Sequence, residues 1–437
     1  MKDFKSNKEN CPILSEKDYQ SGRLLFLIEG CSGMAIYTLS SGAFLAGFFN
    51  YLGVSDRING ILAAFPILFG IIQLFGPLIL EKLEHRKRFT IIFGVSYRAA
   101  LVLMFIIPLL TKGWVGNSAL AATIYGLSAL LGPFFSLAVF NWIISLAPDR
   151  LRGRYLGLKD ALSYIFLTLV TLVMGRVLDF YKVQGQPDRG FLICGITVLM
   201  LLLINAGAVW LAKEPKVPVS GRGINPLEVV SITFRDTGFR KIIFFYILWN
   251  FGFQFAWPFI NVYLVAGLKL DYTYIMVMGL ITNAMRVFTN PFWGGLADRK
   301  SWELTAKLSL LLLAISHGLL FFVNRDTVSF LFPVYSVLNG IAWGGAGIAT
   351  FSLQFNYIPE EVRTVYLATN TAIGGIAGFT GTIISSLILG LIGPGIFKLF
   401  GFSLGSMQVI FFISAILLTF SALFIHLRLG SSRVNDN

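Results

Sequence analysis

The chain has 437 residues, of which 56% are hydrophobic and only 13% are charged, and its formal net charge is +13. Soluble globular proteins carry roughly twice that share of charged residues, so the composition excludes an ordinary soluble domain. The mean hydropathy of +0.74 indicates instead a chain that crosses a membrane many times.

Twelve long apolar stretches follow one another along the chain, and each could cross a hydrocarbon core of ~30 Å as a helix. A membrane barrel would need strands of alternating polarity, and runs such as 199–204 do not alternate. The sequence therefore predicts an all-α membrane protein with 12 transmembrane helices. The predicted spans are 24–49, 58–80, 89–110, 118–146, 158–180, 190–212, 241–266, 272–295, 303–323, 327–356, 365–393 and 403–428.

Lysine and arginine gather in alternate loops, which sets the expected topology. They are frequent in 1–23, 82–88, 150–159, 213–241 and 299–307, and scattered in the intervening loops. By the positive-inside rule, both termini and the central loop are expected in the cytoplasm of a multi-pass plasma-membrane protein. Topology thus accounts for the positive charge, and we expect no nucleic-acid partner.

The chain also contains an internal duplication. The loop 148–156 reads PDRLRGRYL and the loop 359–367 reads PEEVRTVYL, and each lies between two long apolar segments. Matched loops half a chain apart indicate a transporter built from two halves. The predicted division is a tail of 1–22, a six-helix bundle of 23–212, a linker of 213–240, a second bundle of 241–428 and a tail of 429–437.

The loop after the eighth span reads GGLADR at 294–299, which resembles the signature loop of the major facilitator superfamily. A more divergent copy, GPLILEK at 76–82, follows the second span. The resemblance extends over about 23–428 and implies two pseudo-symmetric six-helix bundles, the major facilitator fold. It also implies a ligand site between the bundles near the membrane midplane, and it says nothing about the substrate.

The resemblance further implies a gate at the cytoplasmic side. In the family, the acidic residue of this loop braces the start of a helix in the opposite half, where the helix dipole favours a carboxylate. Carried over, Asp298 would face the start of the fifth span, near 153–160, and Arg299 and Arg152 are counted with the same gate. Glu81 would face the start of the eleventh span, near Arg363. The alternative is that these charges only solvate cytoplasmic turns.

Polar side chains inside membrane spans are costly, so each needs a physical reason. The seventh span places Asn250, Gln254, Trp257 and Asn261 at steps of four, three and four, which is one face of a continuous helix. A polar stripe on an otherwise apolar helix is typical of cavity lining, although hydrogen bonds between helices could also explain it. We predict that these four residues bind the substrate.

The duplication predicts a matching stripe on the first span, and Glu29, Gly33, Tyr37 and Ser40 follow the same steps. We therefore expect Tyr37 to contact substrate and Glu29 to face the cavity. A carboxylate that alternates between burial and water can couple transport to protons. A structural ion pair with Arg98 of the third span is the other interpretation of Glu29, and both remain open.

Two further spans carry polar residues that we also assign to substrate. The eighth span contributes Asn283 and a central Arg286, whose guanidinium suits a carboxylate or phosphate group or a partner such as Glu29. The tenth span contributes Asn339 and Trp343 at helical spacing. His317 of the ninth span is interpreted as a packed polar residue rather than a proton carrier.

The dispersed histidines and cysteines show no catalytic or metal-ligand spacing, so we expect neither an enzyme nor a metal or cofactor site. Amides and aromatic rings suit hydroxyl-rich solutes such as sugars. We therefore predict a monomeric secondary transporter of a small polar organic solute that works by alternating access. Two alternatives remain open: an exporter of hydrophobic, cationic or lipid-like solutes, and a membrane sensor that does not transport.

Overall fold

A computed structural model describes residues 15–75, 86–111, 114–147, 149–215, 233–234, 237–358, 363–393, 397–399 and 402–429. The linker and both tails of the predicted division lie largely outside these residues. The elements of the first half are α1 Glu16–Leu39, α2 Gly42–Tyr51, α3 Asp56–Ala63, α4 Phe65–Phe69, the 3-10 helix η1 Gly70–Phe75, α6 Arg86–Leu110, α7 Asn117–Leu146, α8 Asp149–Val183 and α9 Pro187–Leu211.

The second half repeats this arrangement of long helices. Its elements are α11 Thr237–Gln254, α12 Trp257–Val262, η2 Tyr263–Gly267, α13 Tyr272–Arg299, α14 Trp302–Leu320, α15 Val328–Leu353, η3 Gln354–Tyr357, α16 Arg363–Ile392, α17 Ser406–Phe424 and η5 Ile425–Leu429. A short antiparallel hairpin of β1 Phe397–Leu399 and β2 Phe402–Leu404 lies between α16 and α17. The sequence analysis did not predict this hairpin.

Eleven helical segments in the described part of the chain are long and apolar enough to cross a membrane. The predicted twelfth, α13, is 28 residues long but has a lower hydropathy, because Asn283, Arg286 and Asn290 interrupt its apolar sequence. It packs against α14 and α15 within the second bundle. We therefore retain α13 as a span, and each half has six.

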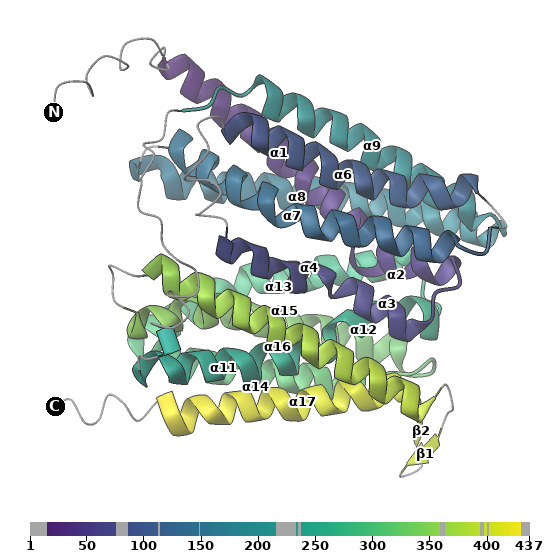
Figure 1. Cartoon of the computed structure of the whole chain (residues 1–437). Helices are drawn as coiled ribbons and strands as arrows, with labels where there is room; N and C mark the ends of the chain where they lie inside the picture. The colour runs from purple at the N-terminus through teal and green to yellow at the C-terminus, as the bar shows by residue number, and fades with distance from the viewer. Residues whose placement is uncertain are drawn as a thin grey trace, which may run out of the picture.

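The two halves form two packed layers of helices (Figure 1). In the first half α1 packs against α8 and α9, and α6 packs against α7 and α9. In the second half α11 packs against α16, and α14 packs against α15 and α17. The start of α1 and the C-terminal end of α17 lie at the same end of the molecule (Figure 1). We call this the terminal end, and the opposite end the outer end.

The first helical span of each half is interrupted at repeat-related positions. The break between α1 and α2 falls at Ser40 and Ser41, followed by Gly42 with a φ of 54° that glycine adopts without strain. The break between α11 and α12 falls at Phe255 and Ala256, just before Pro258. Interrupted helices in corresponding positions of two repeats are typical of transporters with a central site.

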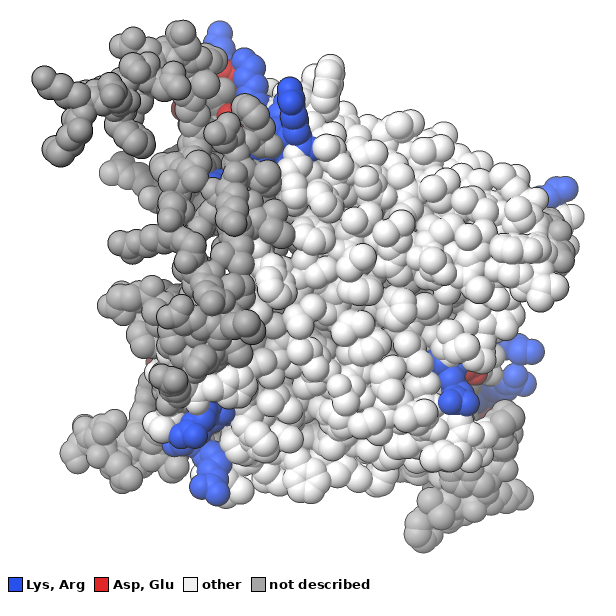
Figure 2. Space-filling model, in the orientation of Figure 1, with Lys and Arg blue, Asp and Glu red and all other residues white. Residues whose placement is uncertain are grey.

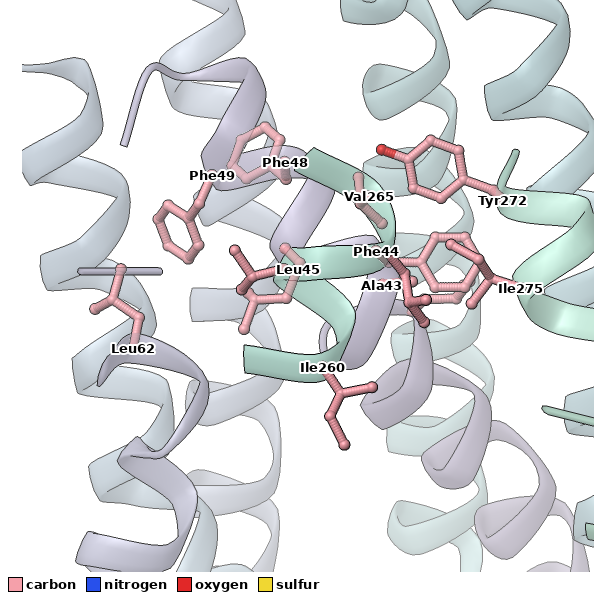
Figure 3. Packing of buried hydrophobic residues seen from close by; sticks show 14 of the residues in the cluster. Ala43, Phe44, Leu45, Phe48, Phe49, Leu62, Ile260, Val265, Tyr272 and Ile275 are labelled. Carbon is pink, nitrogen blue, oxygen red and sulfur yellow. The ribbon is translucent and has the colours of Figure 1, made fainter. Parts of the chain in front are cut away.

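The hydrophobic core divides unequally along the molecule. At the outer end one cluster contains residues of both halves, and within it Phe44 of α2 stacks on Tyr272 of α13 with ring centroids 6.1 Å apart (Figure 3). Toward the terminal end the buried residues form separate clusters, one around Phe26 and Trp142 and another around Phe239 and Phe245. Among the described residues, the core cluster shared by both halves is therefore the one at the outer end, while α3, α4 and η1 contact α16 across the halves along their length.

The charged residues in view are concentrated at the two ends of the molecule. Figure 2 shows lysine, arginine and acidic side chains at the two ends, with an uncharged surface between them. Leu203, Phe288 and Phe330, which lie within predicted spans, are each exposed by more than half. Lipid would cover these side chains in a membrane, so their exposure agrees with the predicted spans.

Candidate functional site

A cavity of about 490 Å³ lies within the first half, a size suited to a small organic molecule. Its wall is formed by α1, α4, η1, α6, α7 and α8. The four residues of the stripe predicted on the first span, Glu29, Gly33, Tyr37 and Ser40, all line it. The helix that carries the stripe is the central helix of this half, packed between α8 and α9.

Glu29 is the centre of a buried charge cluster on the cavity wall. Its Oε1 is 3.3 Å from Nη2 of Arg98, and its Oε2 is 3.7 Å from Nζ of Lys159. The side chains of Glu29 and Arg98 are only 6% and 3% exposed. The pairing of Glu29 with Arg98 anticipated from the sequence is thus present. We call Glu29, Arg98 and Lys159 the charged trio.

Local packing fixes the guanidinium of Arg98. It lies over the rings of Tyr97 and Phe135, with centroids 4.7 and 4.2 Å away, where cation–π attraction adds to the ion pair. Gly33 makes this approach feasible, because a Cβ at position 33 would lie 3.0 Å from Nη2 of Arg98. On the other side of α1, Nδ2 of Asn205 donates to the Glu29 carbonyl oxygen at 2.9 Å and holds the helix against α9.

Lys159 is the functional candidate that the sequence analysis did not identify. It was grouped with the cytoplasmic basic residues because the apolar stretch begins near residue 158. In the structure α8 begins at Asp149, so Lys159 lies ten residues into the helix, about 15 Å along its axis at 1.5 Å per residue. A helix that starts in the polar loop thus carries Lys159 to the depth of Glu29.

A second cavity, of about 210 Å³, lies between the halves. Asn261 and Asn283, two of the residues predicted to bind substrate, line it opposite Thr38, Thr168 and Thr171 of the first half. Asn261 is half-buried and Asn283 is exposed, and both face this space. This part of the predicted site brings together residues from both repeats.

The helix break separates the four residues predicted to share a stripe on the seventh span. A Cβ at Gly374 would lie 2.7 Å from Nδ2 of Asn250, and one at Gly378 would lie 2.9 Å from Cγ of Gln254, so both side chains pack against α16. Neither lines either of the two cavities described above. The expectation of one continuous polar face is corrected, because the step from Gln254 to Trp257 crosses an interruption of the helix.

Trp257 belongs to an aromatic cluster of the second half instead. Its ring stacks on Phe253 at 5.0 Å and lies 6.3 Å from the ring of Trp343. Trp257 is 39% exposed. The buried Nε1 of Trp343 has no hydrogen-bond partner among the described residues. The two tryptophans thus lie together in this cluster, and neither lines the cavity of the charged trio.

The remaining predicted residues of this half are distributed between α13, α14 and α15. Arg286 is half-buried on α13, beside Gly347 of α15. Asn339 is buried, and its Nδ2 donates to Ser316 at 3.4 Å. His317 is fully buried and hydrogen-bonded to Ser414 at 2.8 Å, which agrees with its interpretation as a packed polar residue.

Polar contacts between the halves occur at the outer end. Asp179 of α8 accepts hydrogen bonds from the backbone N–H groups of Tyr272 and Thr273 at 2.7 and 2.8 Å, and so caps the start of α13 from the opposite half. Nζ of Lys182 lies 3.5 Å from Asp271. On the other side of the interface, Nε of Arg57 donates to the Ser386 carbonyl oxygen at 3.0 Å.

Comparison with known proteins decides the family. The sequence model of the Major Facilitator Superfamily matches residues 25–382, most of the chain. The chain belongs to this superfamily. It is a membrane transporter and not an enzyme. No curated protein matches the chain significantly in sequence.

Solved structures of the superfamily share its fold. A point mutant of the nucleoside transporter NupG has a TM-score of 0.71 at 12% identity and covers 93% of this chain and 99% of its own. A POT family peptide transporter in an auto-inhibited state has a TM-score of 0.72 at 12% identity and covers 96% and 98%. The xylose transporter XylE from E. coli, in an inward-open conformation, has a TM-score of 0.62 at 14% identity and covers 94% and 95%.

The gate residues of this major facilitator protein are partly within the described chain. Asp298 and Arg299 are exposed at the end of α13 and form no ion pair with described residues. Glu81 lies outside the described residues, as do the side chains of Arg152 and Arg363. The predicted gate of Asp298 against the start of α8 therefore lies largely outside the described residues.

Proposed function

We propose that this chain is a secondary transporter that moves a small polar organic solute by alternating access, with the 490 Å³ cavity as its principal binding site. The observation that carries the proposal is that three largely buried charged side chains line a cavity large enough for a small solute. Ion pairs of this kind are costly inside a membrane and need a functional reason. Tyr37, 58% exposed on the same wall, supplies an aromatic face and a hydroxyl group.

The joined outer end supports one of the two states that alternating access requires. The N–H groups at a helix start favour a carboxylate, so the cap that Asp179 places on α13 stabilises closure of the halves. With both termini in the cytoplasm of the plasma membrane, this conformation is closed to the outside. The trio and its cavity lie within one chain, so we propose that a monomer suffices.

Asp179→Ala is expected to weaken outer closure by about 0.5–2 kcal/mol, the usual effect of losing a helix cap. Pulsed EPR distances between spin labels at Val183 and Leu391, exposed residues near the outer ends of α8 and α16, would report it. The distribution should broaden toward longer distances in Asp179→Ala and less in Asp179→Asn, which keeps an acceptor oxygen. Unchanged distances in both variants would show that the cap does not hold the gate.

Glu29 is the group that we assign to proton coupling, with Arg98 as its fixed partner. Protonation of Glu29 would remove the negative charge of the trio and leave two cations at the cavity wall. Such a change in charge alters the affinity of the cavity for the solute. Coupling between the proton and the solute requires that binding of one changes the affinity for the other. The groups facing Glu29 are Arg98 and Tyr97 from α6, Lys159 and Tyr155 from α8, and Asn205 from α9.

The test begins with thermal shifts of the purified full chain against sugars, nucleosides, amino acids, short carboxylates, lysolipids and cationic dyes. A ligand at about 100 times its dissociation constant stabilises a protein by ~2.7 kcal/mol. Each ligand found is then measured as uptake into proteoliposomes, with and without a pH gradient. Tyr37→Ala should weaken binding and uptake, whereas Trp210→Ala, on the exposed side of α9, should change neither.

Uptake that is saturable and lost in Tyr37→Ala would support transport through this cavity. Binding without flux would indicate the sensor alternative. Flux that is insensitive to the pH gradient, and equal in Glu29→Gln, would contradict the assignment of proton coupling.

A further inference from the structure

The charged trio leaves the main cavity with a net positive charge. Among the described residues that line it, Glu29 is the acidic one, while Arg98 and Lys159 are the cationic ones. One carboxylate neutralises one of the two cations, so one positive charge remains at the wall. A cation in the cavity would be repelled and an anion attracted, because charges interact strongly away from bulk water.

The excess charge is carried by Lys159 rather than by Arg98. The guanidinium of Arg98 is the closer partner of Glu29 and packs over two neighbouring rings. Nζ of Lys159 is 3.7 Å from Oε2 of Glu29, beyond the usual range of about 2.7–3.2 Å for an N–H···O hydrogen bond. Lys159 also has the more exposed side chain of the two, at 16%. Its ammonium group therefore has donors free for a ligand.

The sequence of α1 makes room for this ammonium group. A Cβ at Gly30 would lie 2.8 Å from both Cε and Nζ of Lys159 and 2.9 Å from Oγ of Ser163. Any larger residue at position 30 would compete with the lysine for this space. Gly30 itself lines the cavity, so the space beside it is continuous with the proposed site.

Two buried polar atoms next to the trio lack partners, which points to a ligand. Nε of Arg98 and Oγ of Ser163 are both buried without a hydrogen-bond partner among the described residues. Both residues are only 2% exposed. Buried polar atoms are normally satisfied, and Oγ of Ser163 shares the space beside Gly30 with Nζ of Lys159, so this unsatisfied hydroxyl next to a cation indicates that a polar group is bound there.

We infer that the solute carries one carboxylate-like anionic group, which binds Lys159 while Glu29 stays paired with Arg98. The inference rests on the proposed function, since it names the substrate class of the same cavity. A single negative charge on the solute matches the single excess positive charge on the wall. The cavity is therefore selective against the cationic solutes of a drug exporter.

The experiment compares solutes of equal shape and different charge on the purified full chain. One series is glucuronate, glucose and glucosamine, and another is nicotinate, nicotinamide and 3-picolylamine. Thermal shifts give dissociation constants, and proteoliposome uptake is measured for every member. We expect the carboxylate of a series to bind at least about tenfold more tightly than its neutral analogue, as a hydrogen bond to a charged group allows.

Matched variants then assign the selectivity. Lys159→Gln should remove the preference for the carboxylate, and Lys159→Arg should retain most of it. Lys241→Gln, a charge loss at an exposed position on α11, should leave the preference unchanged. A purely structural lysine would lower stability in Lys159→Gln without altering the ratio of the dissociation constants.

Each outcome decides between the alternatives. A carboxylate preference lost in Lys159→Gln supports the inference. Equal binding of the neutral or cationic analogue, a preference that survives Lys159→Gln, or no stabilisation by any carboxylate would overturn it. If the neutral analogue alone is taken up into proteoliposomes, the proposed function stands and the inference fails. If a carboxylate binds but no member crosses, the function fails while the binding site remains.

Discussion

Glu29→Leu is expected to lower the free energy of unfolding by about 3–5 kcal/mol, because removing one partner of a buried ion pair leaves the other charge uncompensated. Lys159 can turn toward the cavity, but Arg98 is 3% exposed and fixed over Tyr97 and Phe135. The loss would appear as a lower midpoint in the thermal unfolding of the purified chain. A matched control is Glu16→Leu, which removes a pair with Arg23 whose carboxylate is 72% exposed. Exposed pairs contribute about 0–1 kcal/mol.

The double variant Glu29→Leu/Arg98→Met separates charge from packing. Replacing both members of a buried pair by apolar side chains is often neutral or stabilising, so the double variant should be more stable than Glu29→Leu alone. Its stability should depart from the sum of the two single changes by about 0.5–3 kcal/mol, as for residues in contact. If Glu29→Leu were no more harmful than Glu16→Leu, the trio would contribute nothing to the fold.

Helix type and approximate length were predictable from hydropathy because membrane spans are set by a fixed apolar thickness. The span predicted for 118–146 is α7 at Asn117–Leu146. The same reasoning failed for α8, since hydropathy reports the apolar part of a helix and not its continuation into water. The helix begins at Asp149, nine residues before the predicted span. Because the helix was expected to begin at residue 158, Lys159 was assigned to the cytoplasmic loop and not to the binding site.

The candidate site was predictable where helical periodicity was unbroken. The stripe from Glu29 to Ser40 lies on one continuous helix up to its end, and all four residues face one cavity. The stripe from Asn250 to Asn261 assumed the same continuity across Phe255 and Ala256, where the helix is interrupted. Pro258 favours a new helix start and signalled a break, but periodicity alone cannot say how far the chain turns there. Contacts with Gly374 and Gly378 of α16 required the tertiary structure.

Gly60→Ala is expected to disfavour outer closure and to slow transport. Gly60 of α3 faces Phe259 of α12 across the halves, and an added Cβ would overlap the phenylalanine ring. Phe259 is fully buried, so its ring cannot move aside cheaply. Overpacking of this kind costs about 1–3 kcal/mol. The cost applies only where the halves meet, so the population open at the outer end should rise by about 5- to 150-fold.

Accessibility of the main cavity from each side of the membrane would measure this shift. A reporter Ser136→Cys places a thiol on the cavity wall, in a chain whose three cysteines are replaced by alanine. A membrane-impermeant thiol reagent should label Gly60→Ala faster from the outer side and more slowly from the terminal side. Gly207→Ala, at a helix position with open space around the added Cβ, should label like the parent. Because the clash exists only in the closed state, the labelling rate must rise from the outer side and fall from the terminal side. A rise in the labelling rate from both sides would mean that the variant is partly unfolded and has not shifted between the two states.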